Sequence, residues 1–170
     1  MHNKVVFRAA KAAILEGLPT LRFNFRGVGQ SAGGFGGGVG EREDVRAALD
    51  FLAARFPGSS ICLMGFSFGS WVGLSVGATD PRVATLVGLG VPVGSVGMES
   101  LLEVTKPKLI VQGTLDQYGP KPKLQALFDR LKEPKRLHWV EGVDHFFNGK
   151  LPEVEKCVRG FLRETLVASG

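Results

Sequence analysis

The sequence predicts one α/β domain over residues 1–170, in which helices cover both faces of a mostly parallel sheet of about five strands. Two observations favour this class. Apolar runs rich in β-forming residues alternate with stretches whose apolar residues recur at helical spacing, as in parallel strands joined by helices. The run Val83–Val91 is nearly all apolar, as expected for a strand that is buried on both faces. No repeat or linker divides the chain.

The expected strands end where Gly and polar residues begin. They cover Thr20–Phe25, Ile61–Gly65, Val83–Val91, Lys108–Gln112 and Leu137–Val140. The expected helices carry apolar residues three and four positions apart. They cover Asn3–Glu16, Glu41–Phe56, Phe68–Ala78, Pro122–Leu131 and Pro152–Val167. A glycine-rich loop, Arg26–Gly40, follows the first strand.

Composition narrows the function classes. Hydrophobic residues make up 44% of the chain and charged residues 22%, which is ordinary for a globular domain. The net charge is +5, but the basic residues are scattered, so we expect no nucleic-acid partner. The longest apolar stretch is too short and too rich in Gly and Pro to span a bilayer. Charges at Lys4, Arg8 and Lys11 interrupt any apolar leader, which argues against a signal peptide.

The two cysteines, Cys62 and Cys157, fall at apolar positions of a predicted strand and a predicted helix. No Cys or His spacing is typical of a zinc site. We therefore expect no metal and no cofactor, and a reducing, cytoplasmic setting.

The most informative motif is Gly65-Phe66-Ser67-Phe68-Gly69, which lies between a predicted strand and a predicted helix. A strand that enters G-x-S-x-G and continues as a helix is the layout of a nucleophile elbow, a sharp turn that lifts the serine oxygen above the sheet edge. Asp116 and His145 follow at the ends of two later strands. The carboxyl ends of parallel strands share one edge, so we expect the three side chains to converge there.

Serine, histidine and aspartate at one edge indicate nucleophilic catalysis. The serine hydroxyl needs a base, His145, and the imidazole needs a carboxylate, Asp116, to orient it and balance its charge. The backbone N–H of Phe68 would bind the oxyanion that forms on the substrate.

Each of these residues also has a structural interpretation. Ser67 could be a small residue in a tight turn, Asp116 could cap a loop, and His145 could be a surface histidine. Asp144 competes with Asp116 as the acid. The stretch 27–32 approximates a dinucleotide-binding G-x-G-x-x-A motif, but more glycines follow it in place of a helix, so phosphate binding is disfavoured.

These segments together resemble the α/β-hydrolase superfamily, and within it small serine hydrolases without a cap, related to dienelactone hydrolases and carboxylesterases. The matching segments are 21–31, Gly40-Glu41 with Asp44, 65–69, Gln112-Gly113 with Asp116, and 144–147. The resemblance implies a minimal α/β-hydrolase fold without a lid domain. It also implies a triad of Ser67, Asp116 and His145.

The chain departs from that pattern in two ways. Dienelactone hydrolases use cysteine where Ser67 stands, which favours ester substrates here. Relatives also carry leading strands and a turn before the first helix that supplies a second oxyanion donor. We expect that the strand at 20–25 pairs directly with the strand at 61–65, or that a second protomer covers the gap. The glycine-rich loop or Met1–Asn3 would then supply the second donor.

The sequence therefore predicts a carboxylesterase that cleaves small esters through an acyl-enzyme on Ser67. Phe66 and Phe146 flank the elbow and the histidine and would line the substrate pocket. The expected partner is a small-molecule ester, with neither nucleic acid nor membrane, and a homodimer is possible. The alternative is a truncated hydrolase-like fold with little catalysis that acts as a binding or interaction module.

Overall fold

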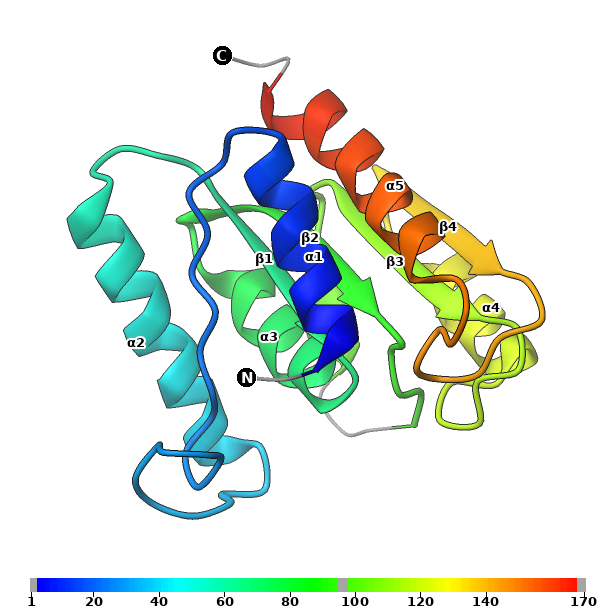
Figure 1. Ribbon diagram of the computed structural model, residues 1–170, viewed down its shortest axis with the longest axis horizontal. Coiled ribbons are helices and arrows are strands. Elements are labelled where there is room, and N and C mark those ends of the chain that lie inside the picture. The colour runs from blue at the N-terminus through cyan, green and yellow to red at the C-terminus, as the bar shows by residue number, and fades with distance from the viewer. Residues whose placement is uncertain (1–2, 95–97, 168–170) are drawn as a thin grey trace.

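The computed structural model describes residues 3–94 and 98–167 and confirms the parallel α/β class. Four parallel strands lie in the order β1-β2-β3-β4 (Figure 1). They are β1 (Ile61–Phe66), β2 (Val83–Leu89), β3 (Lys108–Gly113) and β4 (Lys135–Val140). Because every strand runs the same way, all four carboxyl ends meet at one edge of the sheet.

Helices cover both faces of this sheet (Figure 1). The helices α1 and α5 pack together on one face, and α2, α3 and α4 lie on the other. They span α1 (Lys4–Leu15), α2 (Val39–Arg55), α3 (Phe68–Thr79), α4 (Lys121–Arg130) and α5 (Leu151–Leu162), and the π-helical η2 (Arg163–Val167) extends α5. The described residues between β2 and β3 form turns and the short 3-10 helix η1 (Met98–Leu101), so no lid covers the strand ends there.

The strand β2 is buried on both of its faces. Its residues divide between two cores: Val87 and Leu89 face α1 and α5, whereas Val83 and Leu86 face the opposite helices. All four side chains are buried. Side chains of a strand point alternately to the two faces, so a strand buried on both faces is apolar at nearly every position. Its one hydroxyl residue, Thr85, is buried too.

The prediction of a strand over Thr20–Phe25 is wrong. This segment runs as an extended chain without strand pairing, and the backbone hydrogen bonds of the described residues do not join it to β1. The expected direct pairing with 61–65 is therefore wrong too, and the sheet has four strands. Residues 20–25 have the composition of a strand, but pairing depends on a neighbour within reach.

A buried carboxylate organises the glycine-rich loop. Glu41, 1% exposed, accepts hydrogen bonds from the backbone N–H groups of Gly36 (2.7 Å) and Gly38 (2.8 Å). These bonds, that of Gly36 first, hold the pKa of Glu41 below its ordinary value. Nearby, Asp44 accepts from both the backbone and the guanidinium of Arg26, so both ends of the loop are tied to α2.

Among the described residues, no helix combines the length and apolar character needed to cross a bilayer.

We predict that Glu41→Ala lowers the free energy of unfolding by about 1–3 kcal/mol, because it leaves two loop N–H groups without a partner. Glu43→Ala, which removes an exposed carboxylate from the same helix, should cost less than about 0.5 kcal/mol. Urea denaturation at neutral pH measures both. Because the pKa of Glu41 is lowered in the folded protein, its contribution is present above its unfolded pKa and is lost as the pH falls through the folded value. Equal losses for the two variants at neutral pH would contradict this role.

Candidate active site

Ser67 occupies a strained turn between β1 and α3. Its φ is +53° and its ψ is −126°, a conformation that non-glycine residues seldom adopt. The turn also needs a glycine at position 65, because a Cβ there would lie 2.3 Å from the carbonyl oxygen of Gly69. At Gly69 itself, an added Cβ meets only the Phe25 ring, at 3.7 Å. Of the two motif glycines, Gly65 is the one that close approach requires.

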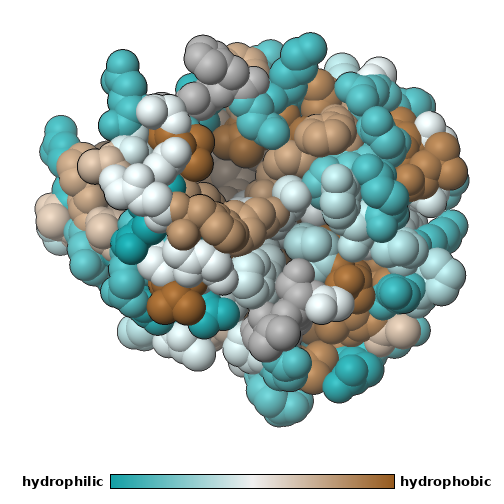
Figure 2. Space-filling view, turned by 90° about the horizontal axis from the view of Figure 1, so that it is seen from below, coloured by the Kyte–Doolittle hydropathy of each residue, from teal (hydrophilic) through white to brown (hydrophobic). Residues whose placement is uncertain are grey.

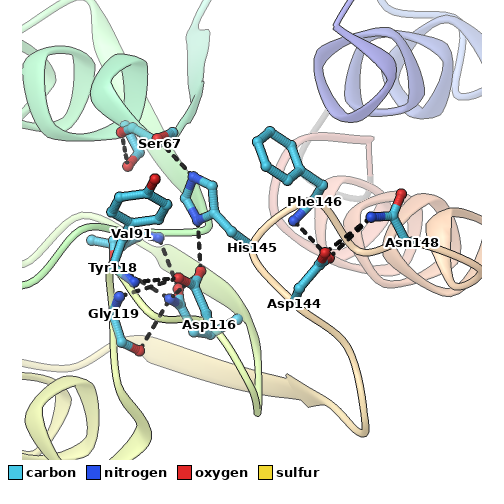
Figure 3. Close-up of polar contacts among 11 residues, drawn as sticks. Ser67, Val91, Asp116, Tyr118, Gly119, Asp144, His145, Phe146 and Asn148 are labelled. Carbon is cyan, nitrogen blue, oxygen red and sulfur yellow. Dashed lines mark hydrogen bonds and ion pairs between the residues drawn. The ribbon is translucent and has the colours of Figure 1, made fainter.

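The structure brings Ser67, His145 and Asp116 together at the carboxyl edge of the sheet (Figure 3). His145 Nε2 lies 2.8 Å from Ser67 Oγ, and His145 Nδ1 lies 2.8 Å from Asp116 Oδ2. The imidazole is 2% exposed and the aspartate 3%. The three residues thus form one continuous hydrogen-bonded chain, with its carboxylate end buried.

Asp116 is held by more than the histidine. Its Oδ1 accepts from the backbone N–H groups of Tyr118 (2.8 Å) and Gly119 (3.2 Å), and its Oδ2 accepts from Gln112 Nε2 at 2.8 Å. The Gln112 side chain is fully buried and its Oε1 accepts from the N–H of Val91. Gln112 therefore ties the acid to the chain that follows β2. The sequence pattern alone indicates no role for Gln112 beyond its place in the matching segment, although a glutamine at the end of an apolar strand is a detectable signal.

Aromatic rings and one glycine define the position of the imidazole. The rings of Phe66, Tyr118 and Phe146 lie 4.9, 4.6 and 5.3 Å from it, centre to centre. At Gly90, an added Cβ would lie 3.1 Å from His145 Cε1 and would also press on the Phe66 ring. Gly90 thus leaves the space that the histidine occupies, a role that its place in the sequence does not indicate.

The geometry distinguishes the two candidate acids. Asp144 accepts from the backbone N–H of Phe146 (3.0 Å) and from Asn148 Nδ2 (3.0 Å), and Figure 3 shows it turned away from the imidazole. It stabilises the local turn that carries His145. Asp116, not Asp144, is in contact with the ring.

The expected pocket residues lie beside this chain of polar groups. Phe66 is half-buried and Phe146 is 49% exposed, and their rings lie 6.0 Å apart. Phe68 is the first residue of α3, where backbone N–H groups lack a partner within the helix. Its ring contacts that of Phe35, at 5.6 Å, so the glycine-rich loop lies close to the elbow.

The second oxyanion donor is not placed by these contacts. In the loop, the N–H groups of Gly36 and Gly38 are already bonded to Glu41. At the chain start, Asn3 uses its side chain to cap α1, and Met1 and His2 lie outside the described residues.

The described residues give less support to metal-dependent or cysteine-based catalysis. Within the described ranges, no cluster of His, Cys, Asp and Glu is arranged to hold a metal ion. Burial raises the pKa of the Cys62 thiol to about 12 and that of Cys157 to about 11, so neither is a reactive thiolate at neutral pH.

A family model described as an alpha/beta hydrolase domain matches residues 1–155. The chain belongs to the alpha/beta hydrolase family. A serine hydrolase homologue from Coxiella burnetii is 40% identical, with a TM-score of 0.89 over 95% of this chain and 77% of that one. A serine hydrolase without a lid from Xanthomonas campestris is 33% identical, with a TM-score of 0.89 over 98% of this chain and 75% of that one. An uncharacterized protein of Rickettsia prowazekii is 34% identical over 95% of this chain and 72% of its own length.

We predict that Gln112→Leu destabilises this hydrolase by about 1–3 kcal/mol, because Asp116 Oδ2 and the Val91 N–H each lose a buried partner. Gln125→Leu is the matched control, since its amide makes only an exposed bond to Asp129, and it should cost less than about 0.5 kcal/mol. Urea unfolding of the two variants measures the difference. If Gln112→Leu were as stable as the control, the amide would not be a support for the acid.

Proposed function

We propose that this protein is a serine hydrolase that cleaves small carboxylic esters through an acyl-enzyme on Ser67. The observation that carries the proposal is the continuous chain Ser67–His145–Asp116, with both links at 2.8 Å and the acid buried. The elbow conformation of Ser67 supports it. The fold of the family supports it as well, since its members include serine hydrolase homologues at 33–40% identity.

The geometry fits a two-step acyl transfer. As Ser67 Oγ bonds to the ester carbonyl carbon, its proton passes to His145 Nε2, while Nδ1–H donates to Asp116. The tetrahedral intermediate then collapses, the C–O bond to the leaving alcohol breaks, and His145 returns the proton to that alcohol. Water repeats the sequence on the acyl-enzyme and releases the acid. The buried carboxylate keeps the ring in the required tautomer.

The oxyanion would bind at the start of α3. The N–H of Phe68 lies in the first turn of a 12-residue helix, where the helix dipole favours negative charge. One assigned donor is fewer than the usual pair, and losing one donor costs about a hundred- to a thousand-fold in turnover. We therefore propose a modest turnover for residues 1–170 alone.

The remaining proposals concern the cellular compartment, the small-molecule partner and the oligomeric state. Cys62 and Cys157 are both free thiols, which fits a reducing compartment such as the cytoplasm. A small-molecule ester is the proposed partner, and a homodimer stays a prediction.

We predict that Ser67→Ala and His145→Ala each reduce hydrolysis of p-nitrophenyl acetate by about a million-fold, since both groups take part in every turnover. Asp116→Asn should cost about ten thousand-fold. Asp144→Asn is the matched control and should stay within about tenfold, because its carboxylate serves only the turn. Wild-type turnover in Ser67→Ala would refute the proposal.

Fluorophosphonate labelling of Ser67 separates an active hydrolase from a non-catalytic binding module without knowledge of the substrate.

We predict further that acetate and butyrate esters react faster than dodecanoate esters by about tenfold or more in kcat/KM, because Phe66 and Phe146 form an open apolar surface with no lid above it. A series of p-nitrophenyl esters of rising chain length measures this preference. A maximum at dodecanoate would mean that a long apolar channel receives the acyl group.

A further inference from the structure

Two exposed aromatic side chains flank the buried histidine of the triad. Tyr118 is 54% exposed and Phe146 is 49% exposed, whereas His145 is 2% exposed. Their ring centres lie 4.6 and 5.3 Å from that of the imidazole. Figure 2 views the molecule from the side of the strand carboxyl ends and shows apolar groups exposed among polar ones on this face. The entrance to the site therefore carries aromatic surface that a substrate can reach.

The two rings lie on opposite sides of the imidazole (Figure 3). Phe146 shares its side with Phe66, whose ring lies 6.0 Å away and packs against the core beneath α1 and α5. On the other side, the backbone C=O of Tyr118 accepts from the N–H of Val93 at 3.0 Å, and Val93 packs against the core of the opposite face. The histidine thus divides the entrance into a Phe66–Phe146 side and a Tyr118 side.

The backbone of Tyr118 is held at both its N–H and its C=O. The N–H donates to Asp116 Oδ1 at 2.8 Å, and the C=O accepts from Val93. The same carboxylate orients the imidazole of His145. One carboxylate therefore positions both the histidine and the backbone that carries the tyrosine ring, and a group held in this way loses little freedom when it binds a ligand.

The proton transfers decide which half of an ester lies beside Tyr118. His145 Nε2 returns its proton to the leaving oxygen, so that oxygen must come within about 3 Å of Nε2, and the alcohol half begins beside the imidazole. The acyl half begins at the carbon bonded to Ser67 Oγ. Phe66 immediately precedes Ser67, which places the acyl half on the Phe66–Phe146 side. The alcohol half then faces Tyr118.

We propose that Tyr118 is a specificity-determining residue that packs against an aromatic leaving alcohol, such as a benzyl alcohol. This inference rests on the proposed ester hydrolysis. A flat ring can bind to a single exposed face, and an aromatic pair adds a preference of about threefold to tenfold beyond that of equal apolar area. The tyrosine side chain takes no part in the proton transfers.

Two isomeric esters place the same phenyl ring in opposite halves of the substrate. Benzyl acetate carries it in the alcohol, and methyl phenylacetate carries it in the acyl group. Titration of the released acid gives kcat/KM for each, and the ratio of benzyl acetate to methyl phenylacetate is compared with that of the wild type. Tyr118→Leu should lower this ratio by about threefold to tenfold, and Phe146→Leu should raise it. A variant that only disturbs the triad slows both reactions alike and leaves the ratio unchanged.

Matched controls separate the tyrosine ring from its hydroxyl and from general effects. Tyr118→Phe keeps the ring and should leave the ratio within about twofold of the wild-type value. Phe51→Leu, at a position of α2 that is 59% exposed, should do the same. Cyclohexylmethyl acetate replaces the aromatic ring of benzyl acetate by a saturated one. The wild type should prefer benzyl acetate over it by about threefold or more, and Tyr118→Leu should lose that preference.

An unchanged ratio in Tyr118→Leu would overturn the inference. So would a ratio that falls in Phe146→Leu, because the alcohol would then lie on the Phe66–Phe146 side. Both outcomes leave the hydrolase proposal intact. Failure of the wild type to hydrolyse either ester, together with no fluorophosphonate label on Ser67, would instead refute the proposed function and this inference with it.

Discussion

The hydrogen bonds at the carboxyl ends of the four parallel strands are the constraint on which the site depends. The N–H of Ser67 bonds to Leu89, that of Gly90 to Val111, and that of Thr114 to Val140. Each bond joins the first residue beyond one strand to the next strand of the sheet. These bonds therefore hold the turns of Ser67 and Asp116 level with Gly90, the residue that makes room for the histidine. A shift in the register of any strand pair would separate the 2.8 Å contacts between the side chains.

Glycines allow these turns to come so close. A Cβ at Gly113 would lie 2.6 Å from the carbonyl oxygens of Val143 and Asp144, and a Cβ at Gly90 would press on the imidazole. The absence of side chains at these points lets the histidine turn pack onto the end of β3 and lets the ring enter between Phe66 and Tyr118. The hydrogen bonds of the site thus depend on close packing at Gly90 and Gly113, and a larger residue at either position would push the packed segments apart.

Local signals in the sequence predict much of the fold and of the candidate site. The elbow, the order of Ser67, Asp116 and His145, and the parallel sheet follow from strand-end positions, because parallel strands bring those ends together. The sequence already favoured Asp116 over Asp144 as the partner of His145, and the contacts agree, since Asp116 Oδ2 meets the ring whereas Asp144 bonds to its own turn. The roles of Gln112 and Gly90 depend on contacts between segments far apart in the chain. Segment 20–25 shows the limit most clearly: its composition is that of a strand, but within the described part of the chain no strand pairs with it.

The strand that carries the nucleophile is also the strand with an open edge. Phe66, the last residue of β1, immediately precedes Ser67, whose conformation is strained. Strain persists only where the surroundings hold it, and here β2 holds one edge of β1 whereas the other edge meets a cavity. The geometry of the elbow therefore depends on the pairing of β1 with β2, and above all on the bond from the Ser67 N–H to Leu89, which fixes the first residue beyond the strand.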